Sequence, residues 1–504
     1  MGRRPWCWML SFVLVANELA RSVPKEDPVA VLDAYASAAR SDWEIPGLAL
    51  AVVKHGEVVL SKGYGVRELG KEDRVDENTL FAIGSTTKAM TVATLGVLFD
   101  EGKLEWDQPV IRYLPEFRLK DPYVTQEATV RDLLTHRTGL GNADYLWYGG
   151  DPPREQVLAQ VDRIEAAHSF RGAFEYQNVM YVAAGELAAR VSGSTWEDLL
   201  RQRLFAPLGM IRSTANTSAA QQIDNVARPH ARIEEKVRPI DNHPLDGVAP
   251  AGGVWSGARE MSRWVLMLLS EGQYEGRTIL SPEVVAEMLR PQELLRIANV
   301  YPYAEWLGSR WQAYGLGWFQ VDYHGRFVCF HTGSIDGMAA IVGIVPEEDL
   351  GVVVLQNLQG ANLRHALLWK CIDLFGGDFD GRDWSREMRE LFGQLEEKGR
   401  QAEEEFRRHR RLDTHPTLPL GSYEGLYENS VYGSARVTSK DGRLRLELAP
   451  LLTADLEQWH YDTFLARFDR RWQDDLRITF HLDAEGAAST MLISDRTFRR
   501  AKQE

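Results

Sequence analysis

The sequence has few cysteines, no excess of positive charge and no long apolar run after its N-terminus. Only Cys7, Cys329 and Cys371 occur in 504 residues. Three cysteines exclude a disulfide framework, and they do not form the cysteine–histidine clusters typical of structural zinc. We therefore expect no metal site and interpret Cys329 and Cys371 as buried free thiols, with a single disulfide between them as the alternative.

The charge balance is acidic. Against 72 Asp and Glu residues stand 58 Lys and Arg residues, a formal net charge of −14. A polyanion would be repelled, so we expect no nucleic-acid partner. The arginines of residues 407–411 lie among glutamates and are interpreted as the solvated face of a helix. Nothing in the composition calls for a cofactor, and we predict none.

The N-terminus has the pattern of an export signal. Arg3 and Arg4 precede an apolar run over residues 6–16, and a polar stretch with small residues follows. Residues 1–22 are therefore predicted to be a signal peptide, which implies a secreted or periplasmic protein; an apolar helix packed on the body is the alternative. The run is too short to span a bilayer, and no later segment is long and apolar enough, so we expect no stable membrane span after signal removal.

The hydrophobic pattern predicts two structural parts joined by a helix. Residues 27–375 show strand patterns at both ends and helical patterns between them, which favours an α/β fold of the α+β type: one antiparallel sheet closed by both ends of the segment, with helices beside it. Residues 376–415 are predicted to be a helical linker, and residues 416–504 a small all-β domain. The expected helices are 28–40, 85–100, 130–135, 154–167, 178–192, 196–204, 258–269, 363–374 and 384–411. The expected strands are 48–53, 58–63, 316–321, 326–330, 338–345, 351–356, 435–439, 444–448, 464–468 and 476–482.

A serine and a lysine stand at the start of the first strongly helical segment. Ser85 opens the helix and Lys88 follows one turn later on the same face. Helix-start amides favour developing negative charge, and a buried lysine of lowered pKa can take the hydroxyl proton. The motif is weak alone, since Ser22-Val23-Pro24-Lys25 also matches it.

Two further short motifs follow in the chain. Tyr176 and Asn178 precede a predicted helix; a phenol there can accept or relay the serine proton, and the amide can hold a substrate carbonyl. A similar Tyr427-Glu428-Asn429 lies in the β-rich C-terminal part and needs no function. His331, Thr332, Gly333 and Ser334 follow an apolar strand pattern. Gly333 would let a substrate approach the backbone, and the amides of Ser334 and Ser85 would form an oxyanion hole.

Together, the three motifs resemble the signature of the penicillin-binding protein and class C β-lactamase superfamily: Ser-x-x-Lys at 85, Tyr-x-Asn at 176 and Lys/His-Thr-Gly at 331, in that order. The segments 129–140, 205–210 and 251–256 also look like family segments, and the resemblance covers roughly residues 27–374. It implies a β-lactamase/transpeptidase-like fold and a serine hydrolase with Ser85 as nucleophile, Lys88 and Tyr176 as proton-handling partners, and Asn178 and His331 orienting the substrate.

The substrate class is less defined. His331 stands where β-lactamases usually carry lysine, and relatives with histidine are often esterases or D-amino-acid peptidases, so we expect hydrolysis of small esters or amide and peptide bonds. A β-lactamase or D,D-carboxypeptidase is the alternative within the family. A catalytically silent member that binds peptidoglycan or a partner is an alternative of another class, and an acyltransferase shares every motif residue.

Aromatic loop residues and the C-terminal domain are open to two interpretations. Tyr145, Trp147 and Tyr148, and later Tyr301, Tyr303, Trp306 and Trp311, either line an apolar acyl pocket or pack against the body. The C-terminal β domain resembles the lipocalin-like appendages of some relatives. We expect it to cap the cleft or to form a homo-oligomer contact.

Overall fold

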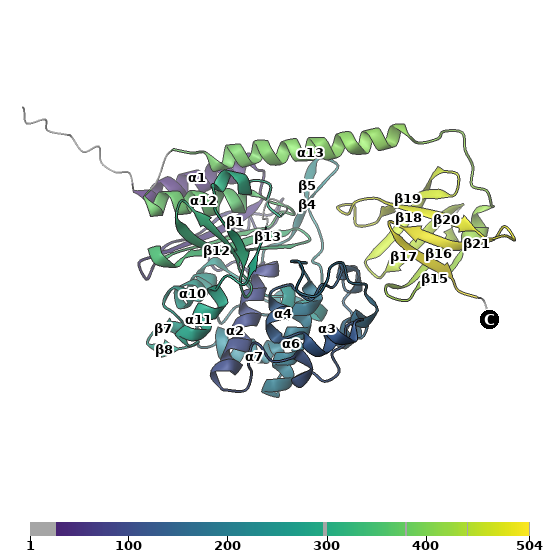
Figure 1. Cartoon of the computed structure of the whole chain (residues 1–504). Helices are drawn as coiled ribbons and strands as arrows, with labels where there is room; N and C mark the ends of the chain where they lie inside the picture. The colour runs from purple at the N-terminus through teal and green to yellow at the C-terminus, as the bar shows by residue number, and fades with distance from the viewer. Residues whose placement is uncertain (1–26, 296–299, 378–380, 441, 503–504) are drawn as a thin grey trace, which may run out of the picture.

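The computed structural model describes residues 27–295, 300–377, 381–440 and 442–502. The predicted signal peptide and Cys7 lie outside these ranges. A mixed sheet-and-helix body is followed by a long helix and a closed β-barrel (Figure 1). In the described part of the chain, no helix has the length and apolar character needed to cross a membrane.

The centre of the body is an eight-stranded sheet in the order β2-β1-β14-β13-β12-β11-β10-β9, with antiparallel neighbours throughout. The two ends of the body meet in it, because β1 lies between β2 and β14, as the sequence pattern predicts. The strands are β1 Gly47–Lys54, β2 Glu57–Gly65, β9 Glu293–Leu294, β10 Gln312–Tyr314, β11 Phe319–Tyr323, β12 Arg326–Ile335, β13 Met338–Val345 and β14 Leu350–Gln356. Three two-stranded sheets add β3 Phe81–Ala82 with β6 Trp255–Ser256, β4 His230–Ile233 with β5 Lys236–Pro239, and β7 Gln273–Tyr274 with β8 Arg277–Thr278.

Helices cover both faces of this sheet, α1 and α12 on one side and the larger helical part on the other (Figure 1). The helices are α1 Pro28–Asp42, α2 Thr87–Asp100, α3 Pro122–Glu127, α4 Val130–Leu134, α5 Arg154–Leu158, α6 Asn178–Ser192, α7 Trp196–Leu200, α8 Thr217–Ala220, α9 Ala249–Gly252, α10 Ala258–Leu269, α11 Pro282–Leu289, α12 Leu363–Gly376 and α13 Trp384–Arg408.

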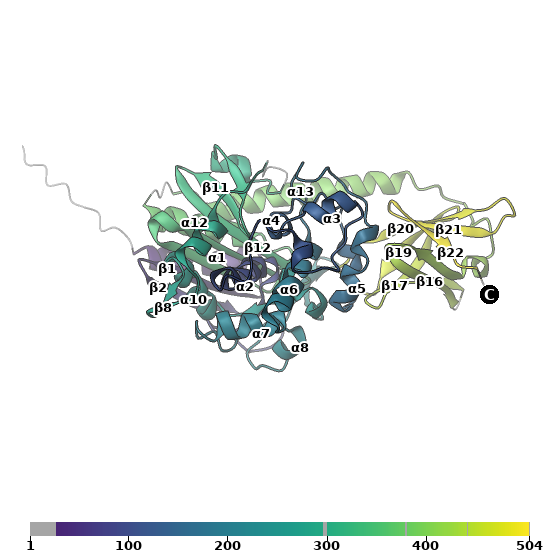
Figure 2. The ribbon, with the colours of Figure 1, turned by 60° about the horizontal axis from the view of Figure 1, so that its bottom comes forward.

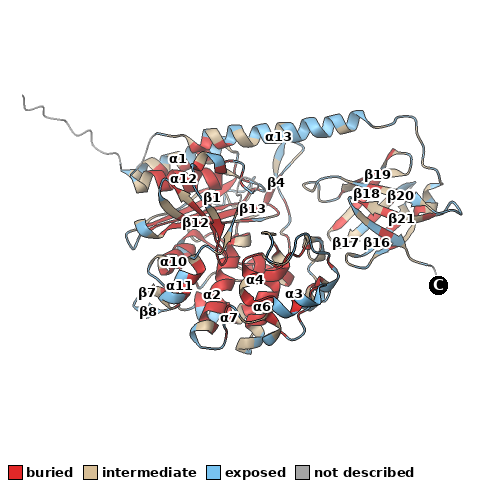
Figure 3. Ribbon diagram, in the orientation of Figure 1, coloured by how far each residue is buried: buried red, intermediate tan, exposed pale blue. Residues whose placement is uncertain are grey.

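Alternation along β1 divides the interior into two cores. Leu48, Leu50 and Val52 belong to the core shared with α1 and α12, whereas Ala49 and Ala51 belong to the core shared with the helical part. Successive side chains of a strand point to opposite faces, so a strand covered on both sides is apolar throughout. Figure 3 shows the result: the sheet and the helices beneath it are buried, while most of α13 is exposed.

One predicted helix is wrong in part, and another is helical but changes its helix type. Residues 154–167 form α5, then a 3₁₀ turn at Val161–Arg163, and residues 164–167 are extended. The end of the predicted segment is not helical because Ala166 forms a β-bridge with Leu140, so a tertiary pairing overrides the local pattern there. Residues 196–204 form α7, followed by a π-helical turn at Arg201–Phe205. Cys329 and Cys371 are buried free thiols, as expected, and not a disulfide.

The C-terminal part is a closed barrel of eight antiparallel strands. Its interior is filled by an apolar cluster of its own, as in barrels of this strand number. This confirms an all-β C-terminal domain; the likeness to lipocalins stays a prediction. The strands are β15 Gly425–Asn429, β16 Gly433–Lys440, β17 Arg443–Ala449, β18 Leu452–His460, β19 Thr463–Phe468, β20 Leu476–Leu482, β21 Ala488–Ile493 and β22 Arg496–Arg500.

Helix α13 is attached at both ends. Trp384 and Met388, near its start, are buried against the body. At its other end the ring of Phe406 stacks on that of Trp459 in the barrel, with centroids 5.3 Å apart. A helix of 25 residues is about 37 Å long, so α13 acts as a strut between the two parts (Figure 1).

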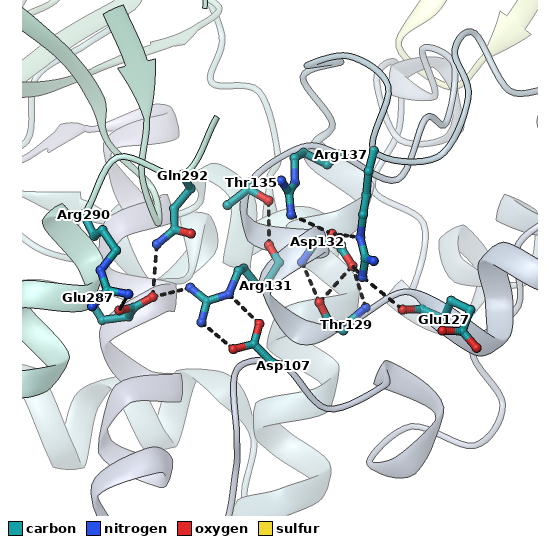
Figure 4. Close-up of polar contacts among 11 residues, drawn as sticks. Asp107, Glu127, Thr129, Arg131, Asp132, Thr135, Arg137, Glu287, Arg290 and Gln292 are labelled. Carbon is teal, nitrogen blue, oxygen red and sulfur yellow. Dashed lines mark hydrogen bonds and ion pairs between the residues drawn. The ribbon is translucent and has the colours of Figure 1, made fainter. Parts of the chain in front are cut away.

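A buried carboxylate fixes the segment that leads to Tyr176 (Figure 4). Asp132, with a fully buried side chain, accepts hydrogen bonds from Thr129 N at 2.9 Å and from Arg171 Nε and Nη2 at 2.9 and 2.7 Å, and lies 3.3 Å from Arg137 Nη2. Arg171 N also donates to the Arg137 carbonyl at 2.9 Å. Burial opposes ionisation, but the hydrogen bonds from Arg171 and Thr129 hold the pKa of Asp132 below its usual value.

We expect Asp132→Asn to destabilise the fold by about 2 kcal/mol, because an amide NH₂ would then face the guanidinium of Arg171. Since the pKa of Asp132 is lowered in the folded state, its contribution is complete above the unfolded-state pKa and is lost as the pH falls through the folded-state pKa. Urea unfolding at several pH values measures this. The difference between the two proteins should be constant above about pH 5 and shrink below about pH 4.

Asp107→Asn is the matched control, since the Asp107 side chain is 73% exposed and pairs with Arg131 at the surface. It should cost less than about 1 kcal/mol. An Asp132→Asn effect as small as that of the control contradicts a structural role for this carboxylate.

Candidate active site

Ser85 lies in a 3₁₀ turn, Gly84–Thr86, that runs directly into α2. Gly84 has a φ of +54°, a conformation that favours glycine, and a Cβ on it would lie 2.6 Å from the amide nitrogen of Ser334. The turn is therefore held against β12, which brings the amide of Ser334 next to the serine turn.

Lys88, the second residue of α2, is fully buried. Its Nζ lies 3.0 Å from Ser85 Oγ, 2.7 Å from Asn178 Oδ1 and 2.8 Å from the carbonyl oxygen of Ala251. Burial lowers the pKa of Lys88 to about 7, against an opposing effect of the Asp144 carboxylate. Near neutral pH a large share of this amine is uncharged.

The three neighbours of Lys88 Nζ fix the direction of the neutral amine. A neutral amine has two N–H groups and one lone pair. The Asn178 and Ala251 oxygens can only accept hydrogen bonds, so they take the two N–H groups. The lone pair is then left for the hydroxyl proton of Ser85, which is the geometry that a base requires.

Tyr176 is the third member of the group, hydrogen-bonded through its side chain to Ser85. Lys88 Nζ lies 4.8 Å from the centre of its ring. Burial raises the pKa of Tyr176 well above its usual value, so the resting group is a neutral phenol. The structure thus brings the hydroxyl, the amine and the phenol together, and it disfavours a resting phenolate as the base.

Sequence analysis missed His136, which holds Tyr176 on both sides. Its carbonyl oxygen accepts from Glu175 N at 2.9 Å, its Nδ1 accepts from Gln177 N at 3.0 Å, and its ring packs on that of Tyr176 with centroids 4.3 Å apart. Because the Gln177 backbone N–H donates to Nδ1, this ring nitrogen carries no proton. Burial lowers the pKa of His136 well below its usual value. A signal existed, since His136 lies in the segment 129–140 that resembles the family.

Asn178 begins α6 and links Lys88 to an acidic residue. Its Nδ2 donates to Asp144 Oδ1 at 3.0 Å, while its Oδ1 accepts from Lys88. Asp144 also accepts from Trp147 Nε1 at 2.9 Å. Nothing in the sequence pattern singles out Asp144, because it stands in a loop and acts through space.

The third motif lies inside β12, and the expectation that it follows the end of the strand is wrong. β12 continues to Ile335 because β13 pairs with it up to Ile335↔Met338. Its pairing with β11, on the other edge, stops at Phe330. Residues 331–335 therefore have one edge without a strand partner, which is the edge available to the serine turn. A Cβ on Gly333 would collide with the carbonyl oxygen of Ile83, so only glycine permits this approach.

His331 is buried and neutral. Its Nδ1 lies 2.6 Å from the carbonyl oxygen of Thr332 and its Nε2 lies 3.1 Å from the Tyr314 hydroxyl. Burial, together with the charge of Lys88, lowers the pKa of His331 to about 3. The side chain therefore offers no cation to a substrate.

A cation that the sequence did not reveal lies behind the same strand. The buried guanidinium of Arg364, in α12, donates to Ser334 Oγ at 2.8 Å and to the carbonyl oxygen of Gly333. These contacts hold the strand in place next to Ser85. The site has no sign of a metal: within the described ranges, no three His, Cys, Asp or Glu side chains are placed to hold one.

A cavity of about 710 Å³ reaches from Asn178 and Ser334 towards the barrel. Tyr145, Trp147 and Tyr148 line it, so the first set of loop aromatics faces a pocket. The second set does not line this cavity, and Trp311 is exposed. Tyr301 and Tyr303 are buried, and Trp311 packs on Phe327 with ring centroids 5.8 Å apart.

The sequence model of the Beta-lactamase family matches residues 33–375, the whole body that carries these groups. The chain belongs to the Beta-lactamase family. Members of this family are serine hydrolases, and the fold described above is the β-lactamase/transpeptidase-like fold. A second model, a domain of unknown function named DUF3471, matches residues 409–504, the barrel.

Three known proteins illustrate the likeness of this Beta-lactamase family member. Unguisins hydrolase ungD of Aspergillus violaceofuscus is 29% identical over 439 residues, covering 80% of this chain and 75% of that protein. The octameric penicillin-binding protein homologue of Pyrococcus abyssi has a TM-score of 0.61 at 21% identity, over 93% of this chain and 99% of that one. The D-amino acid amidase of Ochrobactrum anthropi SV3, solved with D-phenylalanine, has a TM-score of 0.56 at 22% identity, over 69% and 99%.

Proposed function

We propose that this protein hydrolyses small esters or amide and peptide bonds through an acyl-enzyme on Ser85. The observation that carries the proposal is the buried amine of Lys88, whose Nζ lies 3.0 Å from Ser85 Oγ and 2.7 and 2.8 Å from two oxygens that can only accept hydrogen bonds. The fungal relative is named as a hydrolase of unguisins, which supports hydrolysis, and a structural neighbour is named as a D-amino acid amidase, which supports amide bonds as substrates.

The steps follow from these positions. Lys88 takes the hydroxyl proton as Ser85 Oγ attacks the substrate carbonyl, and the amides of Ser85 and Ser334 stabilise the oxyanion. Tyr176, a neutral phenol beside Oγ, gives its proton to the leaving nitrogen or oxygen and regains one from the Lys88 ammonium. A water molecule then attacks the ester on Ser85, and the same groups return the proton to Oγ. Asn178 and Thr332 are left to orient the substrate.

The neutral His331 disfavours β-lactam turnover. A penicillin carries a carboxylate, and the position where β-lactamases usually place a lysine here holds an uncharged ring. Efficient β-lactamase or D,D-carboxypeptidase activity is therefore the second choice. Secretion of the protein and a homo-oligomer through the C-terminal domain belong to the same proposal; the description of the Pyrococcus abyssi relative as an octamer supports assembly.

A substrate panel tests the reaction. Purified protein is given a chromogenic acetate ester, a D-alanine anilide and a chromogenic cephalosporin, and its mass is measured after a fluorophosphonate. We expect turnover of the ester or the anilide, a single adduct on Ser85, and a rate lower by about a thousandfold in Ser85→Ala. No turnover and no adduct contradict the proposal.

The same panel separates the other candidates. A competing amine that captures the acyl group identifies a transferase. Equal ligand-induced melting shifts in the wild type and Ser85→Ala, without turnover, indicate a silent binding protein.

The pH dependence tests the role of Lys88. Only the neutral amine accepts the proton, so kcat/KM should rise with pH through an apparent pKa near 7 and level off about one unit above it. In Asp144→Asn this limb should move to lower pH, since the Asp144 carboxylate raises the pKa of Lys88. An acid limb that stays in place in Asp144→Asn, or that lies below about pH 5, contradicts Lys88 as the base.

A further inference from the structure

The barrel forms the far wall of the cavity that reaches Asn178 and Ser334. The cavity is lined on the body side by the loop at 142–148 and the β12–β13 turn. Figure 2 shows the barrel next to this side of the body. The barrel residues that line the cavity are Leu448, Leu452, Phe468, Trp472, Gln473, Asp474 and Leu476.

The buried carboxylate of Asp336 links this wall of the cavity to the end of β12. Asp336, two residues after Ser334, accepts from Tyr148 Oη at 2.7 Å and from Trp472 Nε1 of the barrel at 3.0 Å. Arg470 Nη1 of the barrel lies 3.5 Å from the same carboxylate, and His243 Nδ1 lies 3.4 Å from it. Burial opposes ionisation, but hydrogen bonds, that of His243 foremost, keep the pKa of Asp336 below its usual value.

Further contacts hold the barrel in the same position. Leu451 N donates to the Gly149 carbonyl at 2.7 Å, and a Cβ on Gly149 would collide with Leu452. The Tyr145 ring packs edge-on against Tyr432, with centroids 5.8 Å apart. Because α13 also contacts the barrel, through Phe406 and Trp459, the barrel is attached at two separate places.

The polar atoms of three aromatic residues in the lining already have hydrogen-bond partners. The indole N–H of Trp472 is donated to Asp336, that of Trp147 to Asp144, and the hydroxyl of Tyr148 to Asp336. These three rings therefore present carbon surface to a ligand. Leu448, Leu452 and Leu476 add aliphatic surface, and about 710 Å³ lies in the range of cavities that enclose an organic ligand, roughly 300–1,000 Å³.

We propose that Trp472 and its apolar neighbours on the barrel determine specificity by binding a bulky apolar group on the acyl side of the substrate. The proposal rests on the hydrolase function proposed above and names its substrate class: esters or amides whose acyl part is aromatic or branched aliphatic. The C-terminal domain is then part of the substrate site. Asp336 is the positioning residue that sets the distance between Trp472 and β12, the strand that carries the Ser334 amide.

Two esters with one leaving group test this, 4-nitrophenyl acetate and 4-nitrophenyl 3-phenylpropanoate. The readout is the ratio of their kcat/KM values in the full-length protein. We expect the wild type to prefer the phenylpropanoate and Trp472→Ala to lower the ratio by about tenfold, since a lost apolar contact is worth one to two orders of magnitude. Leu448→Ala, a milder change in the same wall, should lower it by about threefold.

Tyr461→Ala is the matched control, because Tyr461 is a 56% exposed aromatic residue of the barrel that does not line the cavity, and its ratio should equal that of the wild type. Melting temperatures and the rate of fluorophosphonate labelling show whether each variant is folded with an intact Ser85. Folded Trp472→Ala and Leu448→Ala proteins with the wild-type ratio overturn the proposal. Failure of the hydrolase function itself is distinguishable, because the wild type would then neither cleave the acetate nor take up the label.

Discussion

The burial of one amine is the constraint on which the site depends. Lys88 is enclosed by α2, by the start of α6 and by the α9 segment, and its surroundings lower its pKa to about 7. A lysine in water would be charged and could not accept the proton of Ser85. The two oxygens beside Nζ set the direction of the lone pair, and the strand β12 brings the Ser334 amide next to the serine turn. At their junction, the sheet and the helical part therefore keep the Lys88 amine away from solvent and fix its orientation towards Ser85.

Positioning in this protein relies on buried carboxylates that join distant segments. Asp132 ties the turn at Arg171 to α4 and so fixes the approach to Tyr176, while Asp336 ties the barrel to the turn after Ser334. Asp144 connects Trp147 to Asn178 and thereby to Lys88. Asp132 and Asp336 are buried and surrounded by donors, which satisfies an otherwise costly buried charge, whereas Asp144 is half-buried. The group around Lys88, the barrel wall of the cavity and the loop between them are thus held by specific polar contacts on an apolar body.

Much of the fold could be predicted from the sequence, because the main strands are apolar on both faces and the long helices are periodic. The motifs also identified Ser85, Lys88 and Tyr176 as candidates. That Ser85 and Lys88 lie on the same face could be predicted because they are one helical turn apart in the sequence. The helix predicted at 154–167 failed because Ala166 pairs with Leu140, a contact that local periodicity does not encode. Asp144, Arg364 and the barrel wall around Trp472 were missed for the same reason: their roles depend on neighbours far away in the chain.

The most direct test of this account is the titration of Lys88 itself. In protein labelled with ¹³C at lysine Cε, its NMR resonance is assigned by its loss in Lys88→Arg and followed with pH. The account predicts a midpoint near 7, well below that of the surface lysines. A midpoint close to the ordinary lysine value of about 10.4 would show a charged amine at neutral pH and would contradict the account.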